Sequence, residues 1–295
     1  MFKYRNPIFF LFLFFFLSIP LLSQVITIDS HIDIPFDYME NPQHDPGKIT
    51  DMQVDLDKMK KGGLDSGFFV VYVPQGPLDN EGFKKAKLLA EKKFLAISKM
   101  TKTYSNQIGL ALAPEDIIQL KNNNLLSAAI GIENGYVIGE DLSLLDHYYS
   151  LGARYMTLTH IGHNQIADSS IPSKRLNDEE ELHAGISAFG KKAIKRMNKL
   201  GMMIDISHIS DKASLEAIKL SSAPVIASHS CVKSIADHPR NISDELLFAL
   251  KENEGVIQIT AFANYVKVNN DRFNSIISLG NNLSLIHISE PTRPY

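Results

Sequence analysis

The sequence predicts a parallel α/β fold arranged as a barrel, and three observations carry the prediction. Seven short apolar runs recur along the chain, and segments with helical spacing separate them. Continuous apolar runs are typical of strands that are covered on both faces, as in a parallel sheet. Five of the seven runs end in His or Glu. Because the C-terminal ends of barrel strands meet at one mouth, these residues are expected to lie together.

The strands and helices are expected in alternation. The apolar runs are 25–31, 67–73, 126–133, 153–160, 201–208, 223–230 and 255–262, and a further run at 107–112 is expected to decorate an edge. The helical segments are 81–100, 114–122, 183–200, 211–220 and 243–252, the last opened by a Ser243 cap. Such regular alternation favours a parallel α/β fold. No repeat or Pro/Gly-rich linker interrupts residues 25–280, so one domain is predicted.

Composition limits the class of protein. The 295-residue chain is 44% hydrophobic and 21% charged, which is ordinary for a globular protein. Its formal charge of −3 gives no electrostatic reason to expect a nucleic-acid partner. Cys231 is the single cysteine, so no intrachain disulfide can form.

The first residues are predicted to be a secretory signal peptide rather than part of the fold. Lys3 and Arg5 precede an apolar run from about Ile8 to Leu17, which is the charge order of such leaders. We take residues 1–23 as the leader, with an uncleaved membrane anchor as the alternative. The protein is therefore expected to be exported: periplasmic, secreted or tethered to the outer face of a membrane, with membrane contact only if the leader is retained.

The polar residues at the strand ends predict a metal site. His31 and Asp33 stand at positions i and i+2 of an extended segment and point the same way, so both can bind one ion. A carboxylate can bridge two metals. Placing Glu133 between the pair His31/Asp33 and the pair His208/His229 gives each of two zinc ions three protein ligands. The alternative for each residue alone is a structural role, as a hydrogen-bonded core histidine or a helix cap.

At these residues the sequence resembles the membrane (renal) dipeptidase family of zinc peptidases, over nearly all of residues 25–280. The matching stretches are D-x-H-x-D at Asp29 to Asp33, G-I-E-N-G around Glu133, Y-M-T-L-T-H ending at His160, D-I-S-H at 205–208, S-H-S at 228–230 and R-N-I-S-D from Arg240. The resemblance implies a TIM-type (β/α)8 barrel and hydrolysis of dipeptides. A homodimer is a possible assembly, because family members can dimerise.

The resemblance also implies a role for each site residue. The two zinc ions of a subunit would be held by His31, Asp33, Glu133, His208 and His229, with Glu133 as the bridge. His160 would contact the substrate and stabilise the tetrahedral intermediate, while a metal-bridging hydroxide attacks the peptide carbonyl. Arg240 would receive the C-terminal carboxylate of the dipeptide, a task that suits a planar, permanently charged guanidinium. Tyr265 and Asn164 would line the substrate pocket.

The sequence departs from the family pattern at its end. The family places an aspartate on an eighth barrel strand, within a G-x-D-F-D-G motif. This motif does not occur in the sequence up to Tyr295. Residues 283–295 resemble a translated sequencing adapter, so the hydrolase barrel is assigned to 24–282, as an incomplete barrel, and His287 is not counted as a ligand. A missing strand would expose sheet edges and the core. The chain as written is therefore expected to be poorly soluble or inactive, which dipeptide hydrolysis measures.

Two other functions remain open. Another amidohydrolase-type enzyme, such as a deaminase, lactonase or N-acyl-amino-acid hydrolase, more often begins with H-x-H, so Asp33 disfavours it. An inactive relative that keeps the barrel is the second alternative. The remaining histidines His44, His147, His183 and His238 are expected at the surface or in packing, His163 has no assigned role, and Cys231 is expected to be buried.

Overall fold

The structure is a computed structural model, and it describes residues 25–266 of the chain. The leader predicted over 1–23, the tail predicted over 283–295 and the expected barrel end at 282 lie outside these residues. No helix within 25–266 is long and apolar enough to span a bilayer.

The described residues form one parallel sheet. Its order is β1-β2-β4-β5-β6-β7-β8, and β3 pairs with β4 beside this path. The strands are β1 (Ile28–Asp33), β2 (Ser66–Tyr72), β3 (Ile108–Leu110), β4 (Leu126–Glu133), β5 (Ala153–Thr157), β6 (Met203–Asp205), β7 (Ile226–Ser230) and β8 (Val256–Ile259). All eight residues of β4 are buried, as expected of a strand covered on both faces. The seven predicted strands are confirmed.

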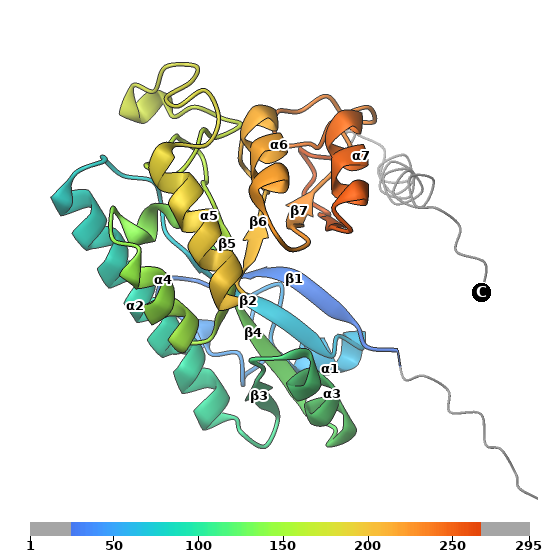
Figure 1. The fold of residues 1–295 in the computed structure, drawn as a ribbon. Coiled ribbons are helices and arrows are strands. Elements are labelled where there is room, and N and C mark those ends of the chain that lie inside the picture. Colours follow the sequence, from blue (N-terminus) through green and yellow to red (C-terminus); the bar gives the residue numbers. More distant parts are fainter. Residues whose placement is uncertain (1–24, 267–295) are drawn as a thin grey trace, which may run out of the picture.

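The sheet curls into a nearly closed barrel, which confirms the predicted fold class. The two ends of the sheet meet at Ser30 of β1: its backbone N–H donates to Gln258 Oε1 of β8 (3.0 Å), and its hydroxyl donates to the Ser228 carbonyl of β7 (2.5 Å). The helices lie outside the strands (Figure 1). The mouth that holds the C-terminal strand ends is therefore surrounded by the loops that follow each strand.

β3 occupies the place predicted for the run 107–112. It pairs with the first residues of β4, from Leu126 to Ala128, whereas β5 pairs with β4 only from Ile130 onward. β2 pairs with β4 along Ser127 to Glu133, so β3 and β5 share the opposite edge of β4. β3 thus extends the N-terminal end of the sheet, away from the mouth.

Seven α-helices occur within residues 25–266. They are α1 (Leu56–Gly62), α2 (Asn80–Thr103), α3 (Pro114–Asn122), α4 (Ser143–Ser150), α5 (Ala188–Leu200), α6 (Asp211–Leu220) and α7 (Asp244–Glu252). The five predicted helices are confirmed, and Ser243 caps α7 as expected, its side chain accepting from Leu246 N–H. The start predicted at 183 is wrong. The backbone N–H groups of His183 and Gly185 donate to Asp168 instead, and α5 begins after a Ser187 cap.

Two predicted strands end earlier than expected. β5 stops at Thr157 and β6 at Asp205, so His160 and His208 stand in the loops that follow them. His208 has φ of 71°, a left-handed conformation that an extended strand cannot contain. The loops carry both imidazoles over the mouth, while His31, Glu133 and His229 lie within β1, β4 and β7.

Candidate metal centre

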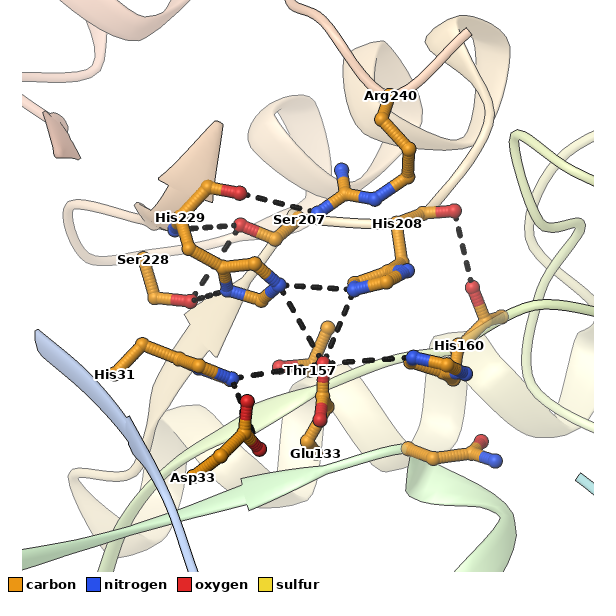
Figure 2. A network of polar contacts seen from close by, with 12 residues as sticks. His31, Asp33, Glu133, Thr157, His160, Ser207, His208, Ser228, His229 and Arg240 are labelled. Carbon is orange, nitrogen blue, oxygen red and sulfur yellow. Dashed lines mark hydrogen bonds and ion pairs between the residues drawn. The ribbon is translucent and has the colours of Figure 1, made fainter. Parts of the chain in front are cut away.

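Five predicted site residues bring their side chains together at the C-terminal ends of the strands (Figure 2). The shared centre is the carboxylate of Glu133, the last residue of β4. Four imidazole Nε2 atoms face its Oε1 atom: those of His208 at 3.0 Å, His229 at 3.4 Å, His31 at 3.7 Å and His160 at 3.8 Å. The Nε2 atoms of His208 and His229 are 2.8 Å apart. Residues separated by up to about two hundred positions in the chain thus converge because their strands are parallel.

The ligand atoms form two overlapping groups that share Glu133. One contains His31, Glu133 and His229, and the other contains Glu133, His160 and His208. Within each group the ligand atoms lie within 4.8 Å of one another. The grouping differs from the sequence-based expectation, which paired His208 with His229 and left His160 for the substrate. The bridging position of Glu133 is common to both arrangements.

Asp33 stands apart from these groups. Its side chain is 72% exposed, and its Oδ1 atom lies 3.8 Å from His31 Nε2. Its position at the end of β1 matches the expected one, two residues beyond His31. The Asp33 carboxylate therefore lies beside the His31 imidazole, as the i, i+2 spacing predicts.

Burial keeps the imidazoles neutral. Burial, together with the nearby His229, lowers the pKa of His31 to about 4. Burial and Arg240 lower the pKa of His229 to about 3. Burial also raises the pKa of Glu133. Neutral imidazoles with free Nε2 lone pairs are the form that binds a metal ion.

The donor set fits a metal ion. A buried carboxylate among neutral imidazoles has the Arg240 guanidinium as its nearby positive charge but no charged group in direct contact, and a buried charge without a close partner is costly. The Nδ1 atom of His208 is also buried without a hydrogen-bond partner among the described residues. Nitrogen and carboxylate-oxygen donors in this number suit zinc. A cation between the imidazoles would supply the positive charge that Glu133 lacks.

Arg240 lies over the same mouth and is 3% exposed. Its Nη2 atom donates to the His229 carbonyl (3.1 Å), and its Nε atom has no partner in the described part of the chain. The guanidinium carbon lies 5.2 Å from the centre of the Tyr265 ring, which also contacts His238 at 4.8 Å. The structure therefore places the Tyr265 ring beside the Arg240 guanidinium.

Asn164 is held by hydrogen bonds within the protein. Its Nδ2 atom donates to Asn134 Oδ1 (3.0 Å) and to the Leu158 carbonyl (2.7 Å), and its Oδ1 atom accepts from the backbone N–H groups of Ile166 and Ala167. The residue is fully buried. A substrate contact through this amide would require one of these bonds to break, so the structure does not bring Asn164 into the pocket.

The histidines predicted outside the site have partners of their own. His44 pairs with Asp37, His147 with Glu91, His183 with the Asn164 carbonyl, and His238 accepts from Arg240 N–H. His163 is 3% exposed and orders the loop after β5, with Nδ1 accepting from Ser169 N–H (3.0 Å) and Nε2 donating to the Glu179 carbonyl (2.9 Å). Cys231 is buried as predicted.

Two residues at the rim of the candidate metal centre were not predicted from the sequence. Lys93 of α2 is 2% exposed, and its Nζ donates to the Ile34 carbonyl (2.8 Å) and lies 4.6 Å from the Phe36 ring centre. Burial lowers the pKa of Lys93 to about 8. The ring of Tyr72, at the end of β2, lies 4.8 Å from the ring of His160. Lys93 occupies a surface-like sequence, KKF, and only the packing of α2 against β2 and the residues after β1 reveals its burial.

Comparison with known proteins places the chain in a family. The sequence profile described as membrane dipeptidase (peptidase family M19) matches residues 18–288. The chain belongs to this family, which confirms the resemblance found in its motifs. The fungal dipeptidase verJ of Clonostachys rogersoniana is 31% identical over 82% of this chain and 64% of its own length. Mouse dipeptidase 3 (Mus musculus) is 31% identical over 82% of this chain and 48% of its own length.

Solved structures share the fold. The probable dipeptidase PvdM from Pseudomonas aeruginosa superposes with a TM-score of 0.79 and 27% identity, over 91% of this chain and 76% of PvdM. A metallopeptidase from Rhodobacter sphaeroides, solved with a phosphinate mimic of the dipeptide L-Ala-D-Ala, gives a TM-score of 0.76 at 18% identity, over 90% and 82% of the two chains. The chain spans about half to two thirds of the length of the curated relatives above.

Proposed function

We propose that this protein is an exported zinc-dependent dipeptidase that hydrolyses the peptide bond of dipeptides. The single observation that carries the proposal is the buried Glu133 carboxylate with four imidazole Nε2 atoms between 3.0 and 3.8 Å from one of its oxygens. Membership of the membrane dipeptidase family supports the substrate class. Export rests on the leader predicted over residues 1–23.

Two zinc ions per subunit are proposed, held by His31, Asp33, Glu133, His208 and His229, with Glu133 between them. Zinc bound there would polarise the scissile carbonyl and lower the pKa of coordinated water toward neutrality. The Asp33 carboxylate lies 3.8 Å from His31 Nε2, close enough for both side chains to bind one ion. The larger exposure of the His160 side chain, 19% against 5% for His208, supports its proposed role as the imidazole that faces the substrate.

Arg240 is proposed to bind the C-terminal carboxylate of the substrate. Its guanidinium is buried, and its Nε–H has no partner among the described residues. A substrate carboxylate would satisfy this donor and provide a counter-charge. Tyr265 would bound the same subsite, and Asn164 enters only as the sequence-based prediction. A longer peptide would place an amide rather than a carboxylate at Arg240, which favours dipeptides.

The proposal is tested by metal binding and by hydrolysis. Metal content is measured first on the full chain, because metal binding can be detected without turnover. We expect zinc to bind, and a chelator to remove both the zinc and any dipeptide hydrolysis. L,L- and L,D-dipeptides, N-acyl-amino acids and lactones form the substrate panel, which separates a dipeptidase from the other amidohydrolase-type enzymes. A chain that binds no divalent ion, or that prefers a lactone or an acyl-amino acid, contradicts the proposal.

A further inference from the structure

Asp205, the last residue of β6, is completely buried beside the candidate metal centre without being one of its proposed ligands. Its carboxylate accepts hydrogen bonds from four donors on three strands or their ends. Oδ1 accepts from the backbone N–H groups of Ser207 and Ser228, both at 3.0 Å. Oδ2 accepts from the hydroxyls of Thr157 and Ser228, the latter at 2.6 Å. The carboxylate therefore has a fixed orientation.

This orientation determines which atom of His229 carries the proton. A carboxylate only accepts, so the single hydroxyl proton of Ser228 points to Asp205 Oδ2. The same hydroxyl oxygen lies 2.8 Å from Nδ1 of His229 and can only accept there. His229 therefore carries its proton on Nδ1. Its Nε2 atom bears the lone pair and faces Glu133 Oε1 at 3.4 Å (Figure 2).

His31 is held in the same tautomer by a separate hydroxyl. The hydroxyl of Tyr155 donates to the Ser30 carbonyl (3.0 Å), so it accepts from His31 Nδ1 (3.1 Å). His31 thus also presents a bare Nε2 atom to the centre. The recurrence of this arrangement on β1 and β7 indicates that the hydroxyls serve the imidazoles rather than general packing.

We propose that Asp205 is a positioning residue that acts through Ser228 to hold His229 in the metal-binding tautomer. The inference rests on the proposed metal centre and extends it inward by one layer, to a residue that touches neither substrate nor metal. A carboxylate behind a histidine ligand orients the ring and raises its basicity, and removing such a partner typically weakens metal affinity about 10- to 100-fold. Here a serine hydroxyl transmits that effect.

Asp205→Asn tests the proton order because the structure fixes how the amide must sit. Two backbone N–H groups point at the Oδ1 position, so the amide oxygen has to occupy it. The amide NH₂ then takes the Oδ2 position and donates to Ser228. The Ser228 proton must turn to His229 Nδ1, which moves the imidazole proton to Nε2, where it blocks the metal.

The first readout is the tautomer of His229, measured by ¹⁵N NMR on metal-free protein. We expect a protonated Nδ1 in the unmodified chain and a protonated Nε2 in Asp205→Asn. The second is zinc affinity, measured by competition with a chromophoric chelator. It is expected to fall about 10- to 100-fold for one of the bound ions. Thermal unfolding checks that each variant is folded.

Two further variants separate positioning from loss of structure. Thr157→Val removes another donor to the same Asp205 oxygen but does not touch His229, so zinc affinity and tautomer should stay unchanged. Asp205→Asn combined with Ser228→Ala removes the hydroxyl that enforces the wrong tautomer, so zinc affinity should recover relative to Asp205→Asn alone. An unchanged tautomer in Asp205→Asn, or a double variant that binds zinc no better, overturns the inference. Absence of zinc binding in the unmodified chain would instead overturn the proposed function, while the NMR readout remains decisive for Asp205.

Discussion

Glu133 joins the two groups of ligand atoms, and its burial gives it opposite effects on stability and on function. The carboxylate is surrounded by imidazoles whose pKa values burial lowers, so these imidazoles do not balance its charge at neutral pH, and burial outweighs the attraction of the Arg240 guanidinium. A charge in such a site weakens the metal-free fold and becomes favourable only when a cation binds. The residue is thus arranged for binding rather than for folding.

Glu133→Gln should separate the two effects. We expect zinc content to fall below the level of the unmodified chain, because the bridging carboxylate is lost. In chelator, the free energy of unfolding should rise by about 1–2 kcal/mol, because a buried charge is removed. Metal analysis and urea denaturation measure both. Glu140→Gln, at an exposed position just after the Gly135–Ile138 turn, is the control and should change neither. A less stable Glu133→Gln protein would show that the carboxylate is already neutralised within the fold.

Arg240 should determine recognition of the free carboxylate. In Arg240→Met, the affinity for a phosphinate dipeptide analogue should fall on the order of 100-fold, because a desolvated charge pair is lost. The same variant should no longer distinguish the free acid from its C-terminal amide. Calorimetry measures both dissociation constants without requiring turnover. Arg196→Met is the control. It removes an arginine of α5 that pairs with Asp146 of α4, and both dissociation constants should stay unchanged. Retained discrimination in Arg240→Met would assign the carboxylate to another residue.

From the sequence, the candidate metal ligands could be predicted better than the residues that hold them in place through hydrogen bonds. His31, Glu133, His208 and His229 converge as expected, because parallel strands bring the first, second and fourth together and the loop after β6 adds His208. Asn164 deviates because hydrogen bonds within the protein occupy its amide. Asp205 was visible only as part of D-I-S-H. The available signal was an acidic residue inside an apolar strand, since a buried carboxylate requires donors around it.

At the level of the elements, continuous apolar runs and helical spacing were enough to place seven strands and five helices. The helices α1 and α4 were not predicted because each is short: α1 buries only Leu56 and Met59, and the N-cap residue of α4, Leu142, provides no side-chain cap. The early ends of β5 and β6 were not predicted, because the loops after these strands keep an apolar sequence. Those loops pack over the mouth, so burial continues although the extended backbone has ended.

The contact between β4 and β5 links strand packing to the metal centre at Gly131. A Cβ atom at this position would lie 2.1 Å from the Tyr155 ring, whose hydroxyl accepts from His31 Nδ1. Gly131→Ala should therefore lower the free energy of unfolding by about 1–3 kcal/mol, as overpacking does. It should also weaken zinc binding, because the Tyr155 ring has to move.

Gly62→Ala provides the matched control for that substitution. Gly62 ends α1, and a Cβ atom there would meet nothing within 4 Å. Alanine should be neutral or stabilise this helix by about 0.5–1 kcal/mol. Urea denaturation and zinc competition on both variants test the link. Normal zinc affinity in a destabilised Gly131→Ala protein would show that Tyr155 does not support His31.

For the whole molecule, metal binding and folding are expected to be coupled through the barrel. The candidate ligands come from β1, β4 and β7 and from the loop after β6, so a bound cation would tie together strands from both ends of the sheet. Such a ligand stabilises the folded state in proportion to its concentration relative to its dissociation constant. The metal-free barrel has to hold the same imidazoles neutral without that contribution.

This requirement gives the metal-free protein a pH-dependent stability. The pKa values of His31 and His229 are about 4 and about 3 in the folded chain, against about 6.5 when unfolded. As the pH falls below about 6.5, the unfolded chain binds protons that the folded chain does not, so the free energy of unfolding decreases. The slope should reach about 1.4 kcal/mol per pH unit for each of these imidazoles. Glu133, whose pKa is raised, acts in the opposite direction at lower pH because it takes up its proton in the folded state first.

Urea denaturation in chelator between pH 7.5 and 5 measures this slope. His31→Gln should reduce the slope by about 1.4 kcal/mol per pH unit, since one neutral buried imidazole is removed. Adding zinc should raise stability at pH 7.5 and make the decline toward pH 5 steeper, because protons then compete with the metal for the same Nε2 atoms. An equal slope in the His31→Gln protein and the unmodified chain would mean that His31 takes up its proton without unfolding, and that the barrel does not enforce the neutral state on which metal binding depends.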